Sequence, residues 1–343
     1  EILIGLVGSE MCIRDRNRRY AEEAFEIVEH AAKKIGSRLP GSDGEKEYAA
    51  YMGDKLRSIG IEPVREEFAV SPRASIGGIP YAGYLGLIMS ALVYVALHLS
   101  AVWYGMALAS VVCWVWLILS VFLYKTWFDM FFKQEISQNT YGELLPPDGK
   151  YDYTIILSGH TDTSWCWRHS AHASKFKKTK PALGLVATFA KVGFGVICFL
   201  FLTAVSIAMT VISSGVYFGE VWALKIANSA SFANFLFAMH FLPVVTAIGC
   251  MFVVMWADPN PRNASRGAMD NATGCALSFA VTKYFHDHPE KMPKNCRIID
   301  FNCGSEEAGL RGSIAFTREH KGEPILENTW TVSYTHLTLP TIA

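Results

Sequence analysis

Residues 79–124 contain no Asp, Glu, Lys or Arg, and His98 is their only histidine. As a helix rising about 1.5 Å per residue, this stretch is about twice as long as a bilayer core of about 30 Å requires. We therefore expect two membrane-spanning helices, at roughly 80–100 and 103–124, joined by a turn near Ser100–Tyr104.

A second apolar pair follows at roughly 190–213 and 235–256, with Lys191 near one end, where its aliphatic stem can reach the membrane interface. The alternative is a set of buried core helices in a soluble protein. Four apolar runs of about twenty residues, in a chain that is 51% hydrophobic, argue against that alternative. The sequence predicts four transmembrane helices arranged as two hairpins, which makes the lipid bilayer an expected partner.

Lys and Arg near the span ends predict the orientation, because they gather on the cytoplasmic side of a membrane. Each hairpin leaves a polar region of the chain and returns to one, so the polar regions should share one side. The opposite side holds only Lys225. The polar flanks hold Arg65, Arg73, Lys125, Lys133, Arg168, Lys175, Lys177, Lys178, Lys180, Arg262 and Arg266. We expect an integral, multi-pass membrane protein whose catalytic domain lies in the cytoplasm.

The polar regions carry three short acidic motifs: GHTDT at 159–163, MDNATG at 269–274 and SEEAGLRGS at 305–313. The first follows residues 151–158, which are typical of a buried strand. His160 and Asp162 lie two apart, so their side chains should share one side of the chain. A carboxylate behind an imidazole fixes the tautomer of a metal-binding histidine.

Glu306 and Glu307 follow a second expected strand, CRIIDFNC at 296–303. Adjacent residues at a strand end point in opposite directions, so one glutamate can bind a metal while the other faces a water molecule. Asp270 precedes the helical pattern Cys275–Phe285, and a helix start favours negative charge. Taken singly, Asp270 could be only a helix cap and GHTDT only a polar turn. Together, the three motifs match the ligand set of a two-zinc hydrolase.

At these residues the chain resembles the zinc exopeptidase family of bacterial leucyl aminopeptidase, aminopeptidase Y and glutamate carboxypeptidase. That family has a His-x-Asp after a strand, an Asp-Asn/Asp-x-x-Gly and a Glu-Glu-x-Gly-Leu-x-Gly-Ser in this order. Residues 38–68 also resemble the family, with an Arg-x-Pro-Gly-Ser turn leading into a helix and a strand.

The resemblance implies two Zn²⁺ ions and a cis peptide bond between Asp270 and Asn271. It also implies a role for each of five residues: His160 as a ligand of one zinc, Asp270 as the bridging carboxylate, Glu307 as a ligand of the second zinc, Glu306 as the general base, and Asp162 as the partner that orients His160.

The expected fold class is α/β: a mixed, mostly parallel sheet flanked by helices, zinc exopeptidase-like and C-terminally incomplete, with the four transmembrane helices inserted as two hairpins. Three catalytic segments are expected, at 17–78, at 125–182 with the His-x-Asp, and at 258–331. The first hairpin (79–124) and the second hairpin (183–257) separate them.

Residues 1–16 and 332–343 (EILIGLVGSEMCIRDR and VSYTHLTLPTIA) resemble translated sequencing-adapter DNA, so we exclude them from the fold. The chain is then expected to be a fragment of a longer parent. The family's remaining Asp and His ligands should follow Thr331, and His336 in the excluded tail is not taken as one of them. The fragment should bind zinc weakly and hydrolyse peptides slowly or not at all.

The sequence thus predicts a membrane-bound zinc exopeptidase, best described as an aminopeptidase, that acts on peptides. Two alternatives remain open: a single-zinc enzyme resembling glutaminyl cyclase, and a non-catalytic membrane interaction module on the same fold. The formal net charge is zero, so nothing indicates nucleic acid as a partner.

Overall fold

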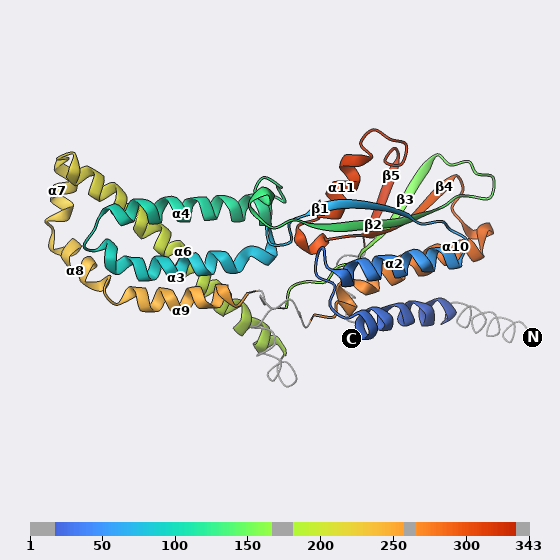
Figure 1. Cartoon of the computed structure of the whole chain (residues 1–343), viewed down its shortest axis with the longest axis horizontal. Helices are drawn as coiled ribbons and strands as arrows, with labels where there is room; N and C mark the ends of the chain where they lie inside the picture. The colour runs from blue at the N-terminus through green and yellow to red at the C-terminus, as the bar shows by residue number, and fades with distance from the viewer. Residues whose placement is uncertain (1–17, 167–180, 257–264, 334–343) are drawn as a thin grey trace, which may run out of the picture. The chain divides into compact units, whose positions relative to one another are not determined.

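The structure is a computed structural model that describes residues 18–166, 181–256 and 265–333 (Figure 1). The chain forms two compact units. Unit 1 comprises Glu1–Pro72, Asp129–Trp165 and Arg262–Ala343, and unit 2 comprises Arg73–Phe128 and Cys166–Pro261. Several sequence-based predictions lie outside the described residues: the adapter-like residues 1–16 and 334–343 with His336, and the basic residues Arg168, Lys175, Lys177, Lys178, Lys180 and Arg262.

Unit 1 contains a five-stranded sheet in the order β1-β2-β4-β3-β5. The strands are β1 (Val64–Val70), β2 (Glu135–Leu144), β3 (Tyr153–His160), β4 (Cys296–Cys303) and β5 (Thr329–Ser333). β3 pairs in parallel with β4 and β5, whereas β2 pairs antiparallel with β1 and β4.

The sheet is therefore mixed, as predicted: two of these strand pairings are parallel and two are antiparallel, and β2 runs opposite to β1, β3, β4 and β5. The parallel part was predicted from β3 and β4, whose apolar runs are buried on both faces, as in parallel sheets. β1 instead alternates exposed and half-buried residues, which is the pattern of an antiparallel edge strand with one solvated face.

Helices cover both faces of the sheet. α2 (Asp43–Ser58) and α10 (Thr273–Asp287) lie on one face together with a helix over residues 18–30 (Figure 1). Their apolar sides share a buried cluster that includes Tyr48, Met52, Leu56, Cys275 and Phe279. On the other face, Phe316 of α11 (Arg311–Glu319) packs in a cluster with Tyr141, Ile156, Ile299 and Phe301.

The sheet brings two of the three motifs to one edge. Parallel pairing sets His160 of β3 opposite Cys303 of β4, so the two strands end together. The segments that follow both strand ends therefore emerge side by side. Short helical turns complete unit 1: Ala31–Ile35 after the first helix, Asp129–Phe131 before β2, Ala268–Ala272 before α10, Pro289–Lys291 before β4 and Glu306–Ala308 before α11.

Unit 2 consists of apolar helices. They are α3 (Ile79–Ala96, preceded by a turn at Ile76–Gly78), α4 (Ala101–Leu117, continued by Ile118–Phe122), α6 (Pro181–Tyr217), α7 (Val221–Ala227), α8 (Ala230–Ala238) and α9 (Leu242–Val254). Helices α3 and α9 approach so closely at Gly83 that a Cβ atom added there would lie 2.5 Å from the Val254 nitrogen. Small residues at such contacts are typical of helix packing in membranes.

Among the described residues of unit 2, three helices are long and apolar enough to cross a membrane: Ile76–Ala96, Ala101–Phe122 and Phe189–Tyr217. Helices α8 and α9 are bent by 49° relative to each other, so neither forms a continuous span. The prediction of four spans holds only if this bent pair counts as one broken span. Pro243 in the first turn of α9 accounts for this break, because proline has no N–H to donate to the preceding turn and its ring clashes with the carbonyl four residues earlier.

Candidate metal centre

His160 is the last residue of β3 and is fully buried. Its Nδ1 lies 3.1 Å from Asp162 Oδ1, and its Nε2 lies 3.0 Å from Asp270 Oδ1 and 3.8 Å from Glu306 Oε2. The structure therefore brings residues from all three sequence motifs around one imidazole ring. Burial lowers the pKa of His160, but hydrogen bonds to Asp162 and Asp270 outweigh it and raise that pKa well above its ordinary value.

Asp162 is also fully buried, and it contacts two of the motifs. Besides the His160 ring, its carboxylate accepts hydrogen bonds from the backbone N–H groups of Glu306, at 3.0 Å to Oδ1, and Glu307, at 2.9 Å to Oδ2. Asp162 thus contacts the His160 ring and also anchors the glutamate turn, and the His-x-Asp spacing alone does not indicate the second contact.

Asp270 lies in an irregular turn just before α10. The Asp270–Asn271 peptide bond is cis, and neither residue has helical backbone angles. The neighbouring Asn271 accepts a hydrogen bond from the first turn of α10, from the Gly274 N–H to its Oδ1 at 2.8 Å. The half-exposed Asp270 carboxylate faces His160, so it is not merely a helix cap.

Glu306 and Glu307 differ in exposure. The Glu306 side chain is 16% exposed and can meet solvent, whereas Glu307 is buried. Burial, together with the negative charges of Asp162, Asp270 and Glu306, raises the pKa of Glu307 to about 8, against the opposing effect of His160. This local excess of negative charge is what a bound divalent cation would compensate.

The donor set suits zinc, which takes imidazole nitrogen and carboxylate oxygen as ligands. Among the described residues, however, no group of three or more His, Cys, Asp or Glu side chains is arranged to hold a metal ion. His160 Nε2 instead contacts Asp270 directly. The metal-binding roles of His160, Asp270 and Glu307 therefore remain predictions, as do the catalytic roles of Glu306 and Asp162.

Two buried charged residues of the Arg38–Glu45 turn also support the site, and no sequence pattern assigned a role to either. The Arg38 guanidinium donates to the carbonyl oxygens of Thr161, Arg266 and Gly267, at 2.8, 2.9 and 2.9 Å, so it ties the His160 segment to the Asp270 segment. Burial lowers the pKa of Arg38.

Glu45 is the second of these residues, and it holds the glutamate turn. Its Oε1 accepts from the N–H of Ser305 at 2.6 Å. Burial and, to a smaller extent, the Asp162 charge raise the pKa of Glu45 to about 8. The only sequence signal is Ser42-x-x-Glu45, a capping-box pattern, which predicts a cap and no contact with residue 305.

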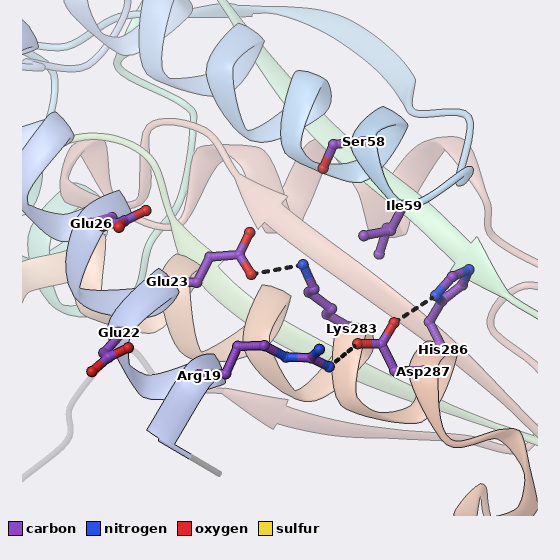
Figure 2. A pocket seen from close by; sticks show the side chains of 9 residues that line it. All are labelled: Arg19, Glu22, Glu23, Glu26, Ser58, Ile59, Lys283, His286 and Asp287. Carbon is purple, nitrogen blue, oxygen red and sulfur yellow. Dashed lines mark hydrogen bonds and ion pairs between the residues drawn. The ribbon is translucent and has the colours of Figure 1, made fainter. Parts of the chain in front are cut away.

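A cavity of about 530 Å³ lies at the opposite end of α10 (Figure 2). It is lined by Arg19, Glu22, Glu23, Glu26, Ser58, Ile59, Lys283, His286 and Asp287. Its charges pair with one another, Arg19 with Asp287 at 2.7 Å and Lys283 with Glu23 at 2.8 Å (Figure 2). These ion pairs join the first helix to α10.

A comparison with protein-family models finds a match that includes two of the three acidic motifs, MDNATG and SEEAGLRGS. Residues 251–332 match the sequence model of Peptidase family M28. The match includes Asp270, Glu306 and Glu307, while His160 and Asp162 precede it. A comparison with curated proteins finds no match.

Among solved structures, a zinc aminopeptidase from Bacillus subtilis is similar to the chain with a TM-score of 0.42 and 12% sequence identity. The similarity covers 91% of this chain and 68% of that one. It is too weak to assign a function.

Proposed function

We propose that residues 17–331 belong to a membrane-bound, zinc-dependent exopeptidase, an aminopeptidase, whose substrates are peptides. The observation that carries the proposal is the convergence of three distant segments: His160 Nε2 lies 3.0 Å from Asp270 and 3.8 Å from Glu306. The match of residues 251–332 to Peptidase family M28 supports peptide hydrolysis as the reaction.

His160, Asp270 and Glu307 would hold the metal, with two zinc ions expected in the full-length parent. Bound zinc supplies Lewis acidity, which polarises a carbonyl and lowers the pKa of water from 15.7 toward about 7. The residues of the chain would supply the remaining chemistry.

Glu306 is the proposed general base. It would take a proton from the attacking water and later deliver it to the leaving amine. Its side chain is partly exposed, so water can reach it, and it lies beside the imidazole. Asp162 would keep the Nδ1 of His160 protonated, which leaves Nε2 facing the site.

The test is product analysis with the full-length parent protein, purified in detergent, treated with a chelator and resupplied with Zn²⁺. Peptides with a free amino terminus should lose residues one at a time from that end, and amino-terminal acetylation should block the reaction. Cyclisation of an N-terminal glutamine with release of ammonia would instead indicate the glutaminyl cyclase class. Absence of both products with zinc bound would favour a non-catalytic module.

We further propose that unit 2 lies in the membrane and that unit 1 faces the cytoplasm. The three long apolar helices support the first point, and the basic flanks support the second. A reporter active only in the cytoplasm should be silent when inserted within 215–230 and active when inserted after Asp148, in the turn between β2 and β3. The reverse pattern would place unit 1 outside the cytoplasm.

A further inference from the structure

The turn that carries both glutamates is held by two buried carboxylates. Three successive N–H groups donate to them: Ser305 to Glu45 at 2.6 Å, and Glu306 and Glu307 to Asp162 at 3.0 and 2.9 Å. Both Glu45 and Asp162 are fully buried. Because the acceptors are in contact with consecutive residues, they fix the direction in which the turn leaves β4.

Glu45 uses both of its oxygens. Its Oε1 accepts from the N–H and the hydroxyl of Ser305, at 2.6 and 3.0 Å. Its Oε2 accepts from the Gly41 N–H at 2.6 Å and from the Ser137 hydroxyl at 3.0 Å. One side chain thus connects the start of α2, strand β2 and the glutamate turn.

Ser305 adopts a backbone conformation that serine rarely takes. Its φ of +51° lies in the left-handed region, which favours glycine, and such residues persist where their surroundings hold them. Two hydrogen bonds from Ser305 to Glu45 help to hold it, and its carbonyl oxygen also accepts from the Arg311 N–H at 3.2 Å. The next residue is Glu306, so the conformation of Ser305 sets where that carboxylate points.

Helix capping alone does not account for these contacts. In a capping box the glutamate bonds back to the N-cap N–H, here that of Ser42. Glu45 bonds instead to the preceding residue, Gly41, and its second oxygen is given entirely to Ser305.

We propose that Glu45 is a positioning residue for the candidate metal centre: through Ser305 it sets the orientation of Glu306 and Glu307. Any effect of Glu45 on catalysis rests on the proposed function. Glu45 touches neither substrate nor metal in this account, and its effect passes through the backbone of residues 305–307.

The first experiment needs no activity. Glu45→Gln keeps the size of the side chain but leaves a single acceptor oxygen, so the amide cannot serve both Gly41 and Ser305. Hydrogen exchange of the Ser305–Glu307 amides should become about tenfold faster or more, while exchange of the β4 amides stays unchanged. Glu47→Gln, at an exposed position of the same helix, is the matched control and should change neither. Unchanged exchange at 305–307, or an equal increase throughout β4, would overturn the proposal.

The second experiment uses the full-length parent and separates positioning from general stability. Glu45→Gln should lower kcat about tenfold or more with little change in KM. Ser305→Gly tolerates the left-handed conformation, so adding it to Glu45→Gln should recover some of the lost kcat. A kcat loss that only follows the folded fraction, or no recovery in the double variant, contradicts the positioning role. If the parent hydrolyses no peptide, the proposed function fails while the exchange experiment still decides the role of Glu45.

Discussion

The two units distribute polar and apolar side chains in opposite ways. Unit 1 buries charged groups, among them Arg38, Glu45, His160 and Asp162. Each of these side chains makes hydrogen bonds to neighbouring residues. Among the described residues of unit 2, the buried polar side chains are serines and threonines, while large apolar side chains such as Ile88, Leu108 and Ile197 are more than half exposed.

This difference supports the surroundings proposed for each unit. Burying a charge costs free energy unless a partner or a metal compensates it. The cluster of buried charged groups in unit 1 therefore indicates a functional site that needs those charges. Exposed apolar helices with hydroxyls turned inward are stable in lipid, where the outside is as apolar as the helix surface. Substitutions that move a charge or a hydroxyl should therefore have different effects in the two units.

The largest expected effect is that of Glu306→Gln in the full-length parent. The amide keeps the size of the side chain but cannot take a proton, so peptide hydrolysis should fall by about 10²–10⁴-fold. Metal content, measured by elemental analysis, should stay near that of the unaltered protein. Glu307→Ala should lose metal instead, because it removes a proposed ligand oxygen. Equal metal loss in both variants would show that the two glutamates are misassigned.

A charge on the outside of unit 2 should have the next largest effect. Ile88, in the middle of α3, is 57% exposed, and an arginine near the centre of a membrane helix costs about 2.5–3.5 kcal/mol for insertion. Ile88→Arg should reduce the inserted fraction in a membrane-integration assay. Phe25→Arg is the control, since Phe25 is 67% exposed in unit 1. Similar results for the two variants would contradict the membrane assignment.

Asp300 tests the burial of charge in unit 1 away from the candidate centre. Burial raises its pKa to about 7, although hydrogen bonds from Ser278 and Asn302 lower it. The folded state thus favours the neutral acid, so the free energy of unfolding should fall as pH rises from about 4 to about 7. Asp300→Asn should remove this pH dependence and raise the free energy of unfolding at pH 8 by about 1–3 kcal/mol. Chemical denaturation of both proteins at pH 5 and at pH 8 measures these two effects. If the free energy of unfolding changed equally between the two pH values in both proteins, this account of Asp300 would be refuted.

The smallest expected effect comes from a hydroxyl pair inside unit 2. Ser90 Oγ and Thr246 Oγ1 lie 2.9 Å apart and join α3 to α9. Such pairs contribute about 0.6 kcal/mol in membrane proteins, so Ser90→Ala should lower stability in detergent by about that amount. A double-mutant cycle with Thr246→Val isolates the pair. A coupling well above about 2 kcal/mol would mean that the pair is more important than a membrane environment allows.

Sequence patterns predicted the features that depend on local spacing. The strands around 151–158 and 296–303, the contact of His160 with Asp162, and a mixed sheet flanked by helices all follow from periodicity or from adjacent residues. The break between α8 and α9 was missed because hydropathy alone ignores the effect of Pro243.

Long-range contacts of single side chains were beyond the sequence patterns. Glu45 lies 260 positions before Ser305, and Arg38 lies 229 before Gly267. Arg38 lies just before α2 and Glu45 in its first turn, where the local pattern indicates only a helix start. The direction of β2 also depends on pairing with β4, more than 150 residues later, and the pattern of β2 gives no sign of it.

The central claim is that the three motifs form one zinc site, and anomalous diffraction at the zinc edge tests it most directly. Crystals of the full-length parent grown with Zn²⁺ should show an anomalous peak about 2.0–2.2 Å from His160 Nε2 and from a carboxylate oxygen of Asp270, with Glu307 bound to a second peak. An absent peak at His160 with zinc saturating, or zinc bound only by cysteines elsewhere in the chain, would contradict the account.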